Sequence, residues 1–225
     1  MKDQFKNFIL PYLKKRKPKK ILEIGVLDGG TTIQILKYCE ENNCQLVSID
    51  PIAWTGNIPE EIKKPYKNFN STILGSNLKP TYIEKIFELN LNKNWTCLKI
   101  TALDFLNSES FNSFDVCLWD GDHNYFSLFN ELKLLHLKSK KDDLIFIQGT
   151  EKWNRKDQYY SKKLIPLEFQ NGKKQGLIRA INDFVKITTN IRYFRLIPFF
   201  YSTSKNWKYK NITNKRHGLV LLTKL

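Results

Sequence analysis

The sequence is short of cysteine and of long apolar runs. None of its four cysteines belongs to a Cys-x-x-Cys pair, and two of them lie in apolar runs that predict buried elements, so we expect free thiols in a reducing cytoplasm. Lys2, Asp3 and Lys6 interrupt the apolar residues near the N-terminus, which excludes a signal-peptide core or a membrane span there, and no later stretch is long and apolar enough to be one. The cysteines are Cys39, Cys44, Cys97 and Cys117.

Acidic residues are also scarce relative to basic ones. The 22 Asp and Glu residues stand against 37 Lys and Arg, which gives a formal net charge of +15. Such a charge favours an acidic partner, for example a nucleic acid, a phosphorylated sugar or a membrane surface. The alternative explanation is compositional bias, because the sequence is rich in Lys, Asn, Ile and Phe throughout and its lysines are scattered.

Length and periodicity indicate one α/β domain over residues 1–225. Apolar residues at helical spacing, followed by a basic run and Pro18, predict a basic-tailed helix within residues 1–19. Thr31 or Thr32 can cap the helix after the first strand, and another amphipathic helix spans residues 125–135. Short apolar runs predict five strands that alternate with helices, at residues 21–24, 46–49, 95–100, 116–119 and 144–147.

Two long segments interrupt this alternation. Residues 51–94 contain four prolines and exceed an ordinary βα connection, so we expect helices there and a position over a site. Residues 149–175 read as a polar loop near the same site, before a helix at about residues 177–185. Two last strands, at residues 193–197 and 219–222, predict an antiparallel hairpin. The expected fold is therefore Rossmann-like and doubly wound, with a mostly parallel seven-stranded sheet and a C-terminal antiparallel hairpin.

Acidic residues lie at the ends of three predicted strands: Glu23, Asp50 and Asp120. In an open parallel sheet, ligands bind beyond the carboxyl ends of the strands. The glycines that follow the first strand let the backbone turn tightly and approach a ligand, and Asp50 can accept hydrogen bonds from both hydroxyls of a ribose. These features predict an adenosine-containing ligand.

The spacing of the glycine-rich loop distinguishes between two such ligands. A dinucleotide fingerprint, Gly-x-Gly-x-x-Gly, would need glycine at Leu27 and would bring a pyrophosphate to the helix N-terminus. The Leu27 side chain and the Asp28 carboxylate would obstruct or repel a pyrophosphate, but they would not oppose the zwitterionic methionine part of S-adenosylmethionine (SAM). The loop therefore favours SAM.

Three segments together resemble the class I SAM-dependent methyltransferases. They are Leu-Glu-Ile-Gly-Val-Leu-Asp-Gly-Gly-Thr-Thr at residues 22–32, Ser-Ile-Asp-Pro at residues 48–51, and residues 114–125, which end in Asp-Gly-Asp-His-Asn-Tyr. The last segment is similar to the Asp-Gly-x-His-x-Tyr element of the branch that includes macrolide-sugar O-methyltransferases and cephalosporin hydroxylase-like proteins. The resemblance spans about residues 20–148 and, more weakly, residues 176–222.

The resemblance implies roles for individual residues. Glu23 and Gly25 would lie beside the methionine and ribose of SAM, Asp50 would bind the ribose hydroxyls, and Ala102 and Leu103 would flank the adenine. The alternative for Glu23 is a strand-end acid that caps a helix, and for Ala102 and Leu103 it is ordinary core packing. The expected cofactor-binding residues are Glu23, Gly25, Gly29, Thr31, Asp50, Ala102, Leu103 and Asp120.

Asp120 and His123 are the expected catalytic residues, with Asp120 nearest the reaction centre. Methyl transfer from a sulfonium is an in-line displacement, so the enzyme must align the acceptor and take a proton from its hydroxyl. A histidine with an ordinary pKa is mostly neutral at cytoplasmic pH, and the resemblance gives His123 the place of the base. The alternative is a histidine that only hydrogen-bonds its loop. We expect His136 and His217 to be structural.

The sequence departs from the branch where a divalent metal would need its second carboxylate. Many members bind the metal through the Asp of the Asp-Gly-x-His element and an acidic residue in a His-Asp-like pair after the fifth strand, and here that pair is Gln148-Gly149. A hard cation needs several oxygen ligands, and this pair supplies no carboxylate. Glu151, acting with Asp120 and Asp122, is the alternative. We expect no metal.

The expected reaction is methylation of a small-molecule hydroxyl, on a sugar of a surface polysaccharide or of a nucleotide-linked precursor. Aromatic residues in the two long loops can stack on sugar rings or can simply anchor the loops. These residues are Trp54, Trp153, Tyr159 and Tyr160. Residues 194–201 are apolar and suit either a subunit contact in a homo-oligomer or the core.

Three other functions remain open. A nucleic-acid methyltransferase would use the positive charge and the basic cluster at residues 14–20, although no Asp-Pro-Pro-Tyr or Asn-Pro-Pro-Tyr signature stands at Asp120. N-methylation of a small-molecule amine fits the same cofactor loops. The glycine at position 149 also suggests a SAM-binding protein without catalytic activity.

Overall fold

The structure is a computed structural model of the chain. It describes residues 1–27, 29–51, 81–158, 165–170, 172, 175–188, 206–215 and 217–225. The chain divides into two compact units, Met1–Gly121 and Asp122–Leu225. The single-domain assignment remains a prediction. Several expectations fall outside the described residues: Asp28, Trp54, the helices expected within residues 52–80, Tyr159, Tyr160, the strand at residues 193–197 and the apolar stretch at residues 194–201.

The N-terminal segment of the first unit is helical. Phe5, Ile9 and Leu13 recur at every fourth position and are all buried, because this spacing places them on one helix face. The backbone of Lys17 is left-handed, with φ 50°, and ends the segment. The basic-tailed helix predicted within residues 1–19 is confirmed. Its three consecutive parts are α1 (Lys2–Gln4), the π-helical turn η1 (Phe5–Ile9) and α2 (Leu10–Arg16).

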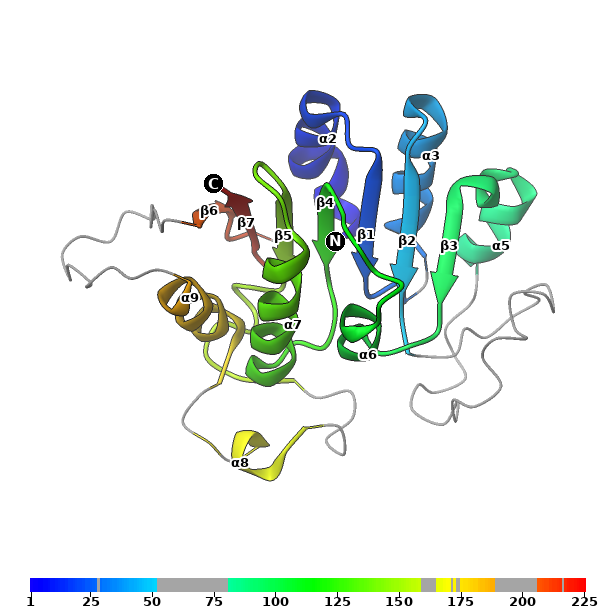
Figure 1. Ribbon diagram of the computed structural model, residues 1–225. Helices are drawn as coiled ribbons and strands as arrows, with labels where there is room; N and C mark the ends of the chain where they lie inside the picture. The colour runs from blue at the N-terminus through cyan, green and yellow to red at the C-terminus, as the bar shows by residue number, and fades with distance from the viewer. Residues whose placement is uncertain are drawn as a thin grey trace. The chain divides into compact units, whose positions relative to one another are not determined.

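Four parallel strands form the sheet of the first unit (Figure 1). They are β1 (Lys20–Ile24), β2 (Gln45–Ile49), β3 (Trp95–Leu98) and β4 (Val116–Trp119). β1 lies between β2 and β4, and β3 pairs with the other edge of β2. Every residue of β4 is buried, as is expected for a central strand covered on both faces. The first four predicted strands are confirmed, with β3 two residues shorter than predicted.

Helices follow these strands, and one predicted helix cap is wrong. Thr31 stands at the N-cap position of α3, but its backbone is helical, with φ −82° and ψ −44°, and its side chain makes no capping hydrogen bond. A capping side chain normally needs an extended backbone to reach the first free amides. Thr32 turns its hydroxyl to Glu23 instead. The described helices that follow β1 in this unit are α3 (Thr32–Asn42), α5 (Thr81–Glu88), η3 (Leu91–Asn94) and α6 (Ala102–Asn107).

Within its described residues, the second unit contains an antiparallel group of strands and three helices. β7 (Leu219–Lys224) pairs antiparallel with both β5 (Leu144–Gln148) and β6 (Trp207–Thr213). The long helices α7 (Tyr125–Lys138) and α9 (Leu177–Ile187) pack against each other, and α8 (Leu167–Gln170) is a single turn. Asn124 caps α7 by accepting a hydrogen bond from the Ser127 amide at 2.8 Å.

A C-terminal antiparallel hairpin is present, as predicted, but it pairs β7 with β6, which was not predicted, whereas the strand predicted at residues 193–197 lies outside the described residues. Trp207 is the one buried residue of β6, while Lys208 and Lys210 are exposed. This strand lies at the edge of the sheet order, where charged side chains are common and no continuous apolar run is needed. Because lysines alternate with the less exposed residues of β6, the strand has no continuous apolar run from which it could be predicted.

The strands follow the order β3-β2-β1-β4-β5-β7-β6 in one seven-stranded sheet. The predicted Rossmann-like class, with parallel strands followed by an antiparallel hairpin, is confirmed. Across the described ranges, no helix combines the length and the apolar character that crossing a membrane requires.

Candidate functional site

The glycine-rich loop begins where the ends of β1 and β4 meet. Gly25 has φ 92°, and a Cβ atom there would overlap the carbonyl oxygen of Asp120 and lie 2.7 Å from its carbonyl carbon. The amide of Asp120 donates to the Ile24 carbonyl at 2.8 Å, and the amide of Gly25 donates to the Ile49 carbonyl at 2.9 Å. Glycine is required at position 25 because the backbone is left-handed and no side chain fits. The structure thus brings together Gly25 and Asp120, both predicted site residues.

Asp50 shapes the same loop from the end of β2. Its Oδ2 accepts hydrogen bonds from the amides of Val26 at 2.8 Å and Leu27 at 2.9 Å, and the residue is buried. Leu27 is left-handed, with φ 50°, and half-exposed, while Gly29 has φ 77°. The loop therefore turns around the Asp50 carboxylate. This structural role was not predicted, and ribose binding by Asp50 remains a prediction.

Glu23 lies in a buried polar network beneath the loop. Its Oε2 accepts hydrogen bonds from the hydroxyls of Ser48 at 2.6 Å and Thr32 at 2.9 Å, and Trp95 donates to the Ser48 oxygen at 2.9 Å. Burial raises the pKa of Glu23 from 4.5 to about 8, although the two hydroxyls lower it. Glu23 is therefore mostly a neutral acid at pH 7. Its bonds go to two hydroxyl groups, so it does not cap α3 through backbone amides.

The remaining members of this network were missed from the sequence. Ser48 lies directly in the apolar run before Asp50, and a polar residue inside a buried strand is the signal that it has a buried partner. Thr32 was assigned to capping. Trp95 was assigned only to a strand, although a buried indole usually finds an acceptor for its N–H group.

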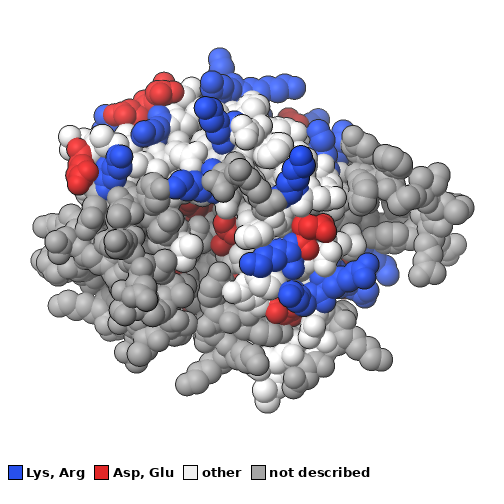
Figure 2. Space-filling view, turned by 180° about the vertical axis from the view of Figure 1, so that it is seen from behind, with Lys and Arg blue, Asp and Glu red and all other residues white. Residues whose placement is uncertain are grey.

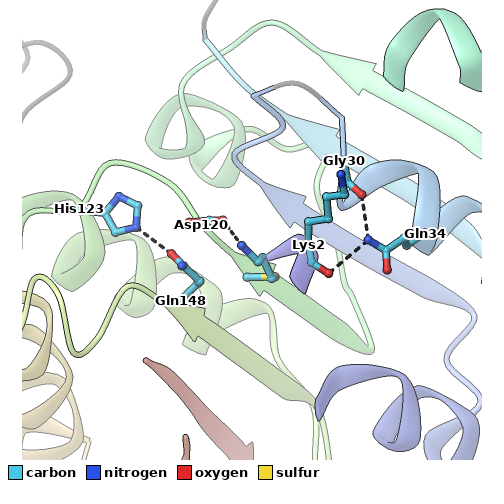
Figure 3. Close-up of polar contacts among 7 residues, drawn as sticks. Lys2, Gly30, Gln34, Asp120, His123 and Gln148 are labelled. Atoms are coloured by element: carbon cyan, nitrogen blue, oxygen red, sulfur yellow. Dashed lines mark hydrogen bonds and ion pairs between the residues drawn. The ribbon is translucent and has the colours of Figure 1, made fainter. Parts of the chain in front are cut away.

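Asp120 is held by the N-terminal segment. The Met1 ammonium lies 3.1 Å from Asp120 Oδ2, and the Asp120 side chain is 27% exposed. Gln34 of α3 donates to the carbonyls of Lys2 at 3.2 Å and Gly30 at 3.0 Å, which fastens the same segment to the glycine-rich loop (Figure 3). No local pattern indicates the contacts of Met1 with Asp120 and of Lys2 with Gln34, because they join residues far apart in the chain.

Ala102 and Leu103, the predicted adenine neighbours, form the first turn of α6. Thr101 caps this helix by accepting a hydrogen bond from the Asp104 amide at 3.1 Å. Ala102 is buried and Leu103 is half-buried. Thr31 is half-buried at the start of α3. Their predicted contacts with a cofactor are not tested by these positions.

His123 belongs to the second unit and is buried in the loop before α7. Its Nε2 lies 3.2 Å from Oε1 of Gln148, the last residue of β5 (Figure 3). Its carbonyl accepts a hydrogen bond from the Gln158 amide at 2.8 Å, and its ring lies beside that of Trp153, with 5.9 Å between the ring centroids. These contacts hold the predicted base in a defined orientation. Two residues separate it from Asp120 in the chain.

Gly149 has no room for a side chain. It has φ 86°, and a Cβ atom there would lie 2.6 Å from His123 Nε2 and 3.0 Å from Trp153 Cδ1. The histidine ring therefore fills the space that a side chain at position 149 would need. An acidic residue at 149, as the family resemblance would give, is sterically excluded while His123 keeps this position.

The described residues do not fit a divalent metal. Within the described ranges, no group of three or more His, Cys, Asp or Glu side chains is arranged to hold an ion. Asp122 Oδ2 accepts hydrogen bonds from Asn124 at 2.6 Å and Ser127 at 3.4 Å, and Glu151 is exposed. Since Gln148 faces His123, the oxygen ligands that a hard cation requires do not converge.

The loop after β5 is anchored by an aspartate that was not predicted. Asp157 Oδ1 accepts hydrogen bonds from the amides of Tyr125 at 2.9 Å and Gly176 at 2.6 Å, which ties the loop to the starts of α7 and α9. The ammonium groups of Lys152 and Lys156 lie over the ring of Trp153 in this loop, at 4.6 and 5.4 Å from the ring centroid. The loop thus presents an aromatic ring and two cations beside His123.

The other two histidines have structural contacts. His136 Nδ1 accepts a hydrogen bond from Trp207 Nε1 at 3.0 Å, and Lys224 Nζ lies 2.8 Å from the same nitrogen. The His217 carbonyl accepts a hydrogen bond from the Glu151 amide at 2.8 Å. The His136 contacts agree with the structural role predicted for it, and the structural role of His217 stays a prediction.

No family model and no curated protein sequence matches the chain. The O-methyltransferase from Bacillus cereus, solved in complex with S-adenosylhomocysteine (SAH), is 13% identical, with a TM-score of 0.54 over 97% of this chain and 79% of that one. The O-methyltransferase TomG from Streptomyces achromogenes, involved in tomaymycin synthesis and solved with SAM, is 10% identical, with a TM-score of 0.54 over 95% and 76%.

A third match is the SAH-bound methyltransferase PaMTH1 from Podospora anserina. It is 11% identical, with a TM-score of 0.55 over 96% of this chain and 76% of that one. At these identities the likeness concerns the fold. The chain therefore has the class I Rossmann-like fold of these methyltransferase structures.

Proposed function

We propose that this protein is a SAM-dependent methyltransferase that methylates a hydroxyl group of a small molecule. The observation that carries the proposal is the loop after β1, in which Gly25 lies against the end of β4 and Asp50 binds the amides of Val26 and Leu27. Such loops at the carboxyl ends of parallel strands are where open α/β sheets bind ligands. The fold is shared with enzymes solved with SAM or SAH.

In this proposal the first unit binds the cofactor. Asp50 accepts hydrogen bonds from the ribose hydroxyls as well as from the loop amides, and Ala102 and Leu103 contact the adenine. Gly29 and Thr31 belong to the loop around the methionine part. Glu23 fixes the loop from below through Thr32, and Asp120 lies nearest the reacting methyl group.

His123 supplies the proton transfer. SAM, when bound, provides a methyl group on a sulfonium centre. The imidazole of His123 takes the proton from the acceptor hydroxyl as its oxygen attacks the methyl carbon and the carbon–sulfur bond breaks, which leaves SAH and a methyl ether. The proton then passes from the imidazolium to solvent. No metal ion takes part in this proposal.

The loop beside His123 supports a sugar acceptor that carries negative charge. Trp153 offers an aromatic ring, on which a pyranose face can stack, and Lys152 and Lys156 place two ammonium groups at it. A nucleotide-linked sugar, or a sugar of a surface polysaccharide precursor, combines a ring with an anion. Figure 2 shows one face of the molecule, on which Lys and Arg side chains are spread with acidic side chains among them. The placement of Lys152 and Lys156 therefore supports this assignment better than the total charge does.

We also propose a reducing cytoplasm as the setting of this reaction. All four cysteines are free, and three of them are buried. Buried free thiols persist where the redox environment keeps them reduced. A cytoplasmic location would also give access to nucleotide-linked sugars.

The proposal is tested by calorimetric binding of SAH and by transfer of labelled methyl groups from SAM to a pool of nucleotide-linked sugars. Asp50→Asn is expected to weaken SAH binding about tenfold through loss of charge-assisted hydrogen bonds. His123→Ala is expected to bind SAH normally and to lose 10²- to 10⁴-fold in transfer, a loss of roughly the size that general bases supply. His217→Ala serves as the matched control.

Four results would overturn this function. Absence of SAH binding would contradict the cofactor. Binding without transfer to any acceptor, and without an effect of His123→Ala, would favour a SAM-binding protein that lacks catalysis. Salt-sensitive RNA binding with methylation of RNA would favour the nucleic-acid methyltransferase, and transfer to an amine would favour N-methylation.

A further inference from the structure

A glutamine amide faces the ring of the proposed base. Gln148 ends β5, where its backbone pairs with Leu219 of β7, so the side chain starts from a fixed point of the sheet. Its Oε1 lies 3.2 Å from Nε2 of His123, and both residues are buried, at 5% and 6% exposure (Figure 3). Water competes little for a hydrogen bond between two such groups.

The chemistry of the two atoms determines which ring nitrogen carries hydrogen. An amide oxygen can only accept a hydrogen bond, so the facing Nε2 must be the donor, and in a neutral imidazole the other nitrogen, Nδ1, then holds the lone pair. We propose that Gln148 is a positioning residue that holds His123 in the Nε2–H tautomer, which leaves the lone pair of the proposed base on Nδ1. This inference rests on the proposed function.

The surroundings of the ring oppose the alternative orientation. Exchange of the two nitrogens needs a rotation of the ring, and the backbone of Gly149 lies directly against the Cδ2 and Nε2 edge, with Trp153 beside it. The bond from the Gln158 amide to the His123 carbonyl holds the backbone of the loop. The ring orientation is thus fixed by packing, and the amide selects the tautomer.

The neutrality of Gln148 gives it a distinct effect from a carboxylate. A carboxylate at this position would also accept from Nε2–H, but it would stabilise the imidazolium and keep the base protonated to higher pH. The charged side chains on the segments around His123 include Asp122, which accepts from Asn124 and Ser127, Lys152 and Lys156 over the Trp153 ring, and Asp157 on the Tyr125 amide. An amide therefore orients the base without adding charge.

The tautomer is measured directly by long-range ¹H–¹⁵N NMR on the ¹⁵N-labelled full chain. The chain has three histidines, and His123→Asn identifies the signals of His123. We expect neutral His123 to show a protonated Nε2 and an unprotonated Nδ1. Gln148→Leu is expected to shift the tautomer ratio about tenfold toward Nδ1–H, since one buried hydrogen bond is lost. A wild-type Nδ1–H tautomer, or a ratio unchanged in Gln148→Leu, overturns the inference.

A second variant keeps the test valid if Gln148→Leu does not fold. Gln148→Glu retains an acceptor, so the Nε2–H tautomer should persist, while the acidic limb of the activity profile should move about one unit to higher pH. An unmoved limb overturns the inference. Gln45→Leu removes an exposed amide from β2 and should change neither readout. If wild-type protein transfers no methyl group, the proposed function fails, whereas the NMR spectrum still decides the tautomer.

Discussion

At the scale of single residues, two glycines are constrained by atoms of another residue. A side chain at position 25 would overlap the carbonyl of Asp120, and a side chain at position 149 would overlap the His123 ring. Both have a φ near 90°, where a side chain is strained even in open space. Each glycine thus makes possible a contact between two parts of the proposed site.

Gly149→Ala tests this constraint. We expect the free energy of unfolding to fall by about 2–3 kcal/mol, because the added methyl group meets the His123 ring and the backbone conformation disfavours alanine. The measurement is urea unfolding. Gly121→Ala is the matched control, because its nearest contact is a side-chain atom at 3.2 Å, no left-handed backbone is involved, and the loss should be under about 1 kcal/mol. Equal losses in the two variants would refute the argument.

Glu23→Gln tests the buried acid. Burial raises the pKa of Glu23 to about 8. The folded protein therefore retains a proton that the unfolded chain releases above pH 4.5, so the stability linked to this group is present at low pH and lost as pH rises from 4.5 to 8.

In urea unfolding, the free energy of unfolding of Glu23→Gln relative to wild type should rise by about 3 kcal/mol between pH 5 and pH 8. The exposed Asp104→Asn variant should show no such change. A pH-independent difference for Glu23→Gln would mean that Glu23 does not titrate in this range.

At the scale of elements, a cluster of three side chains joins α7 to the hairpin. Trp207 of β6 donates to Nδ1 of His136 on α7, Lys224 Nζ of β7 lies 2.8 Å from the same nitrogen, and the Lys224 ammonium also lies over the Trp207 ring at 5.1 Å. Trp207 is the one fully buried residue of β6, so it is the main apolar anchor of this edge strand.

Trp207→Phe should therefore weaken the packing of β6. Loss of the indole N–H bond and of part of the buried ring is expected to lower the free energy of unfolding by about 2 kcal/mol. Lys208→Ala, one residue along the strand and exposed, should change it by less than about 0.5 kcal/mol. Thermal or urea unfolding compares the two variants. Similar values for both would mean that the cluster does not anchor the strand.

The elements that could be predicted are those whose residues carry their own signal. Continuous apolar runs predicted β1, β2, β4, β5 and β7. Asp50 and Asp120 directly follow two of these runs, so their positions at strand ends were predicted as well. The edge strand β6 gave no such run. The bonds of Asp50 to the loop amides, of Met1 to Asp120 and of Gln148 to His123 depend on the folded geometry, and no local pattern encodes them.

At the scale of the whole molecule, the chain is either one cooperative domain or two. Met1–Gly121 and Asp122–Leu225 are two compact units, but the strand order of one sheet includes strands from both. A shared sheet would have to lose its pairing as a unit, so we expect a single unfolding transition.

Urea unfolding followed by far-UV circular dichroism and by tryptophan fluorescence measures this cooperativity. The five tryptophans include Trp95 and Trp119 in the first unit and Trp153 and Trp207 in the second, so fluorescence reports on both. We expect the two probes to give coincident curves. Separate midpoints would show two independent domains and would contradict the single-domain assignment.

The contact between Gly149 and His123 also restricts how this protein can change by mutation. An aspartate introduced alone at position 149 would displace the histidine ring, and a smaller residue introduced alone at position 123 would remove the proposed base. Both single steps are impaired, although the double change would relieve the overlap. The two positions should therefore show strong epistasis, with a coupling energy of about 1–3 kcal/mol in a double-mutant cycle, and homologous sequences should exchange them as a pair.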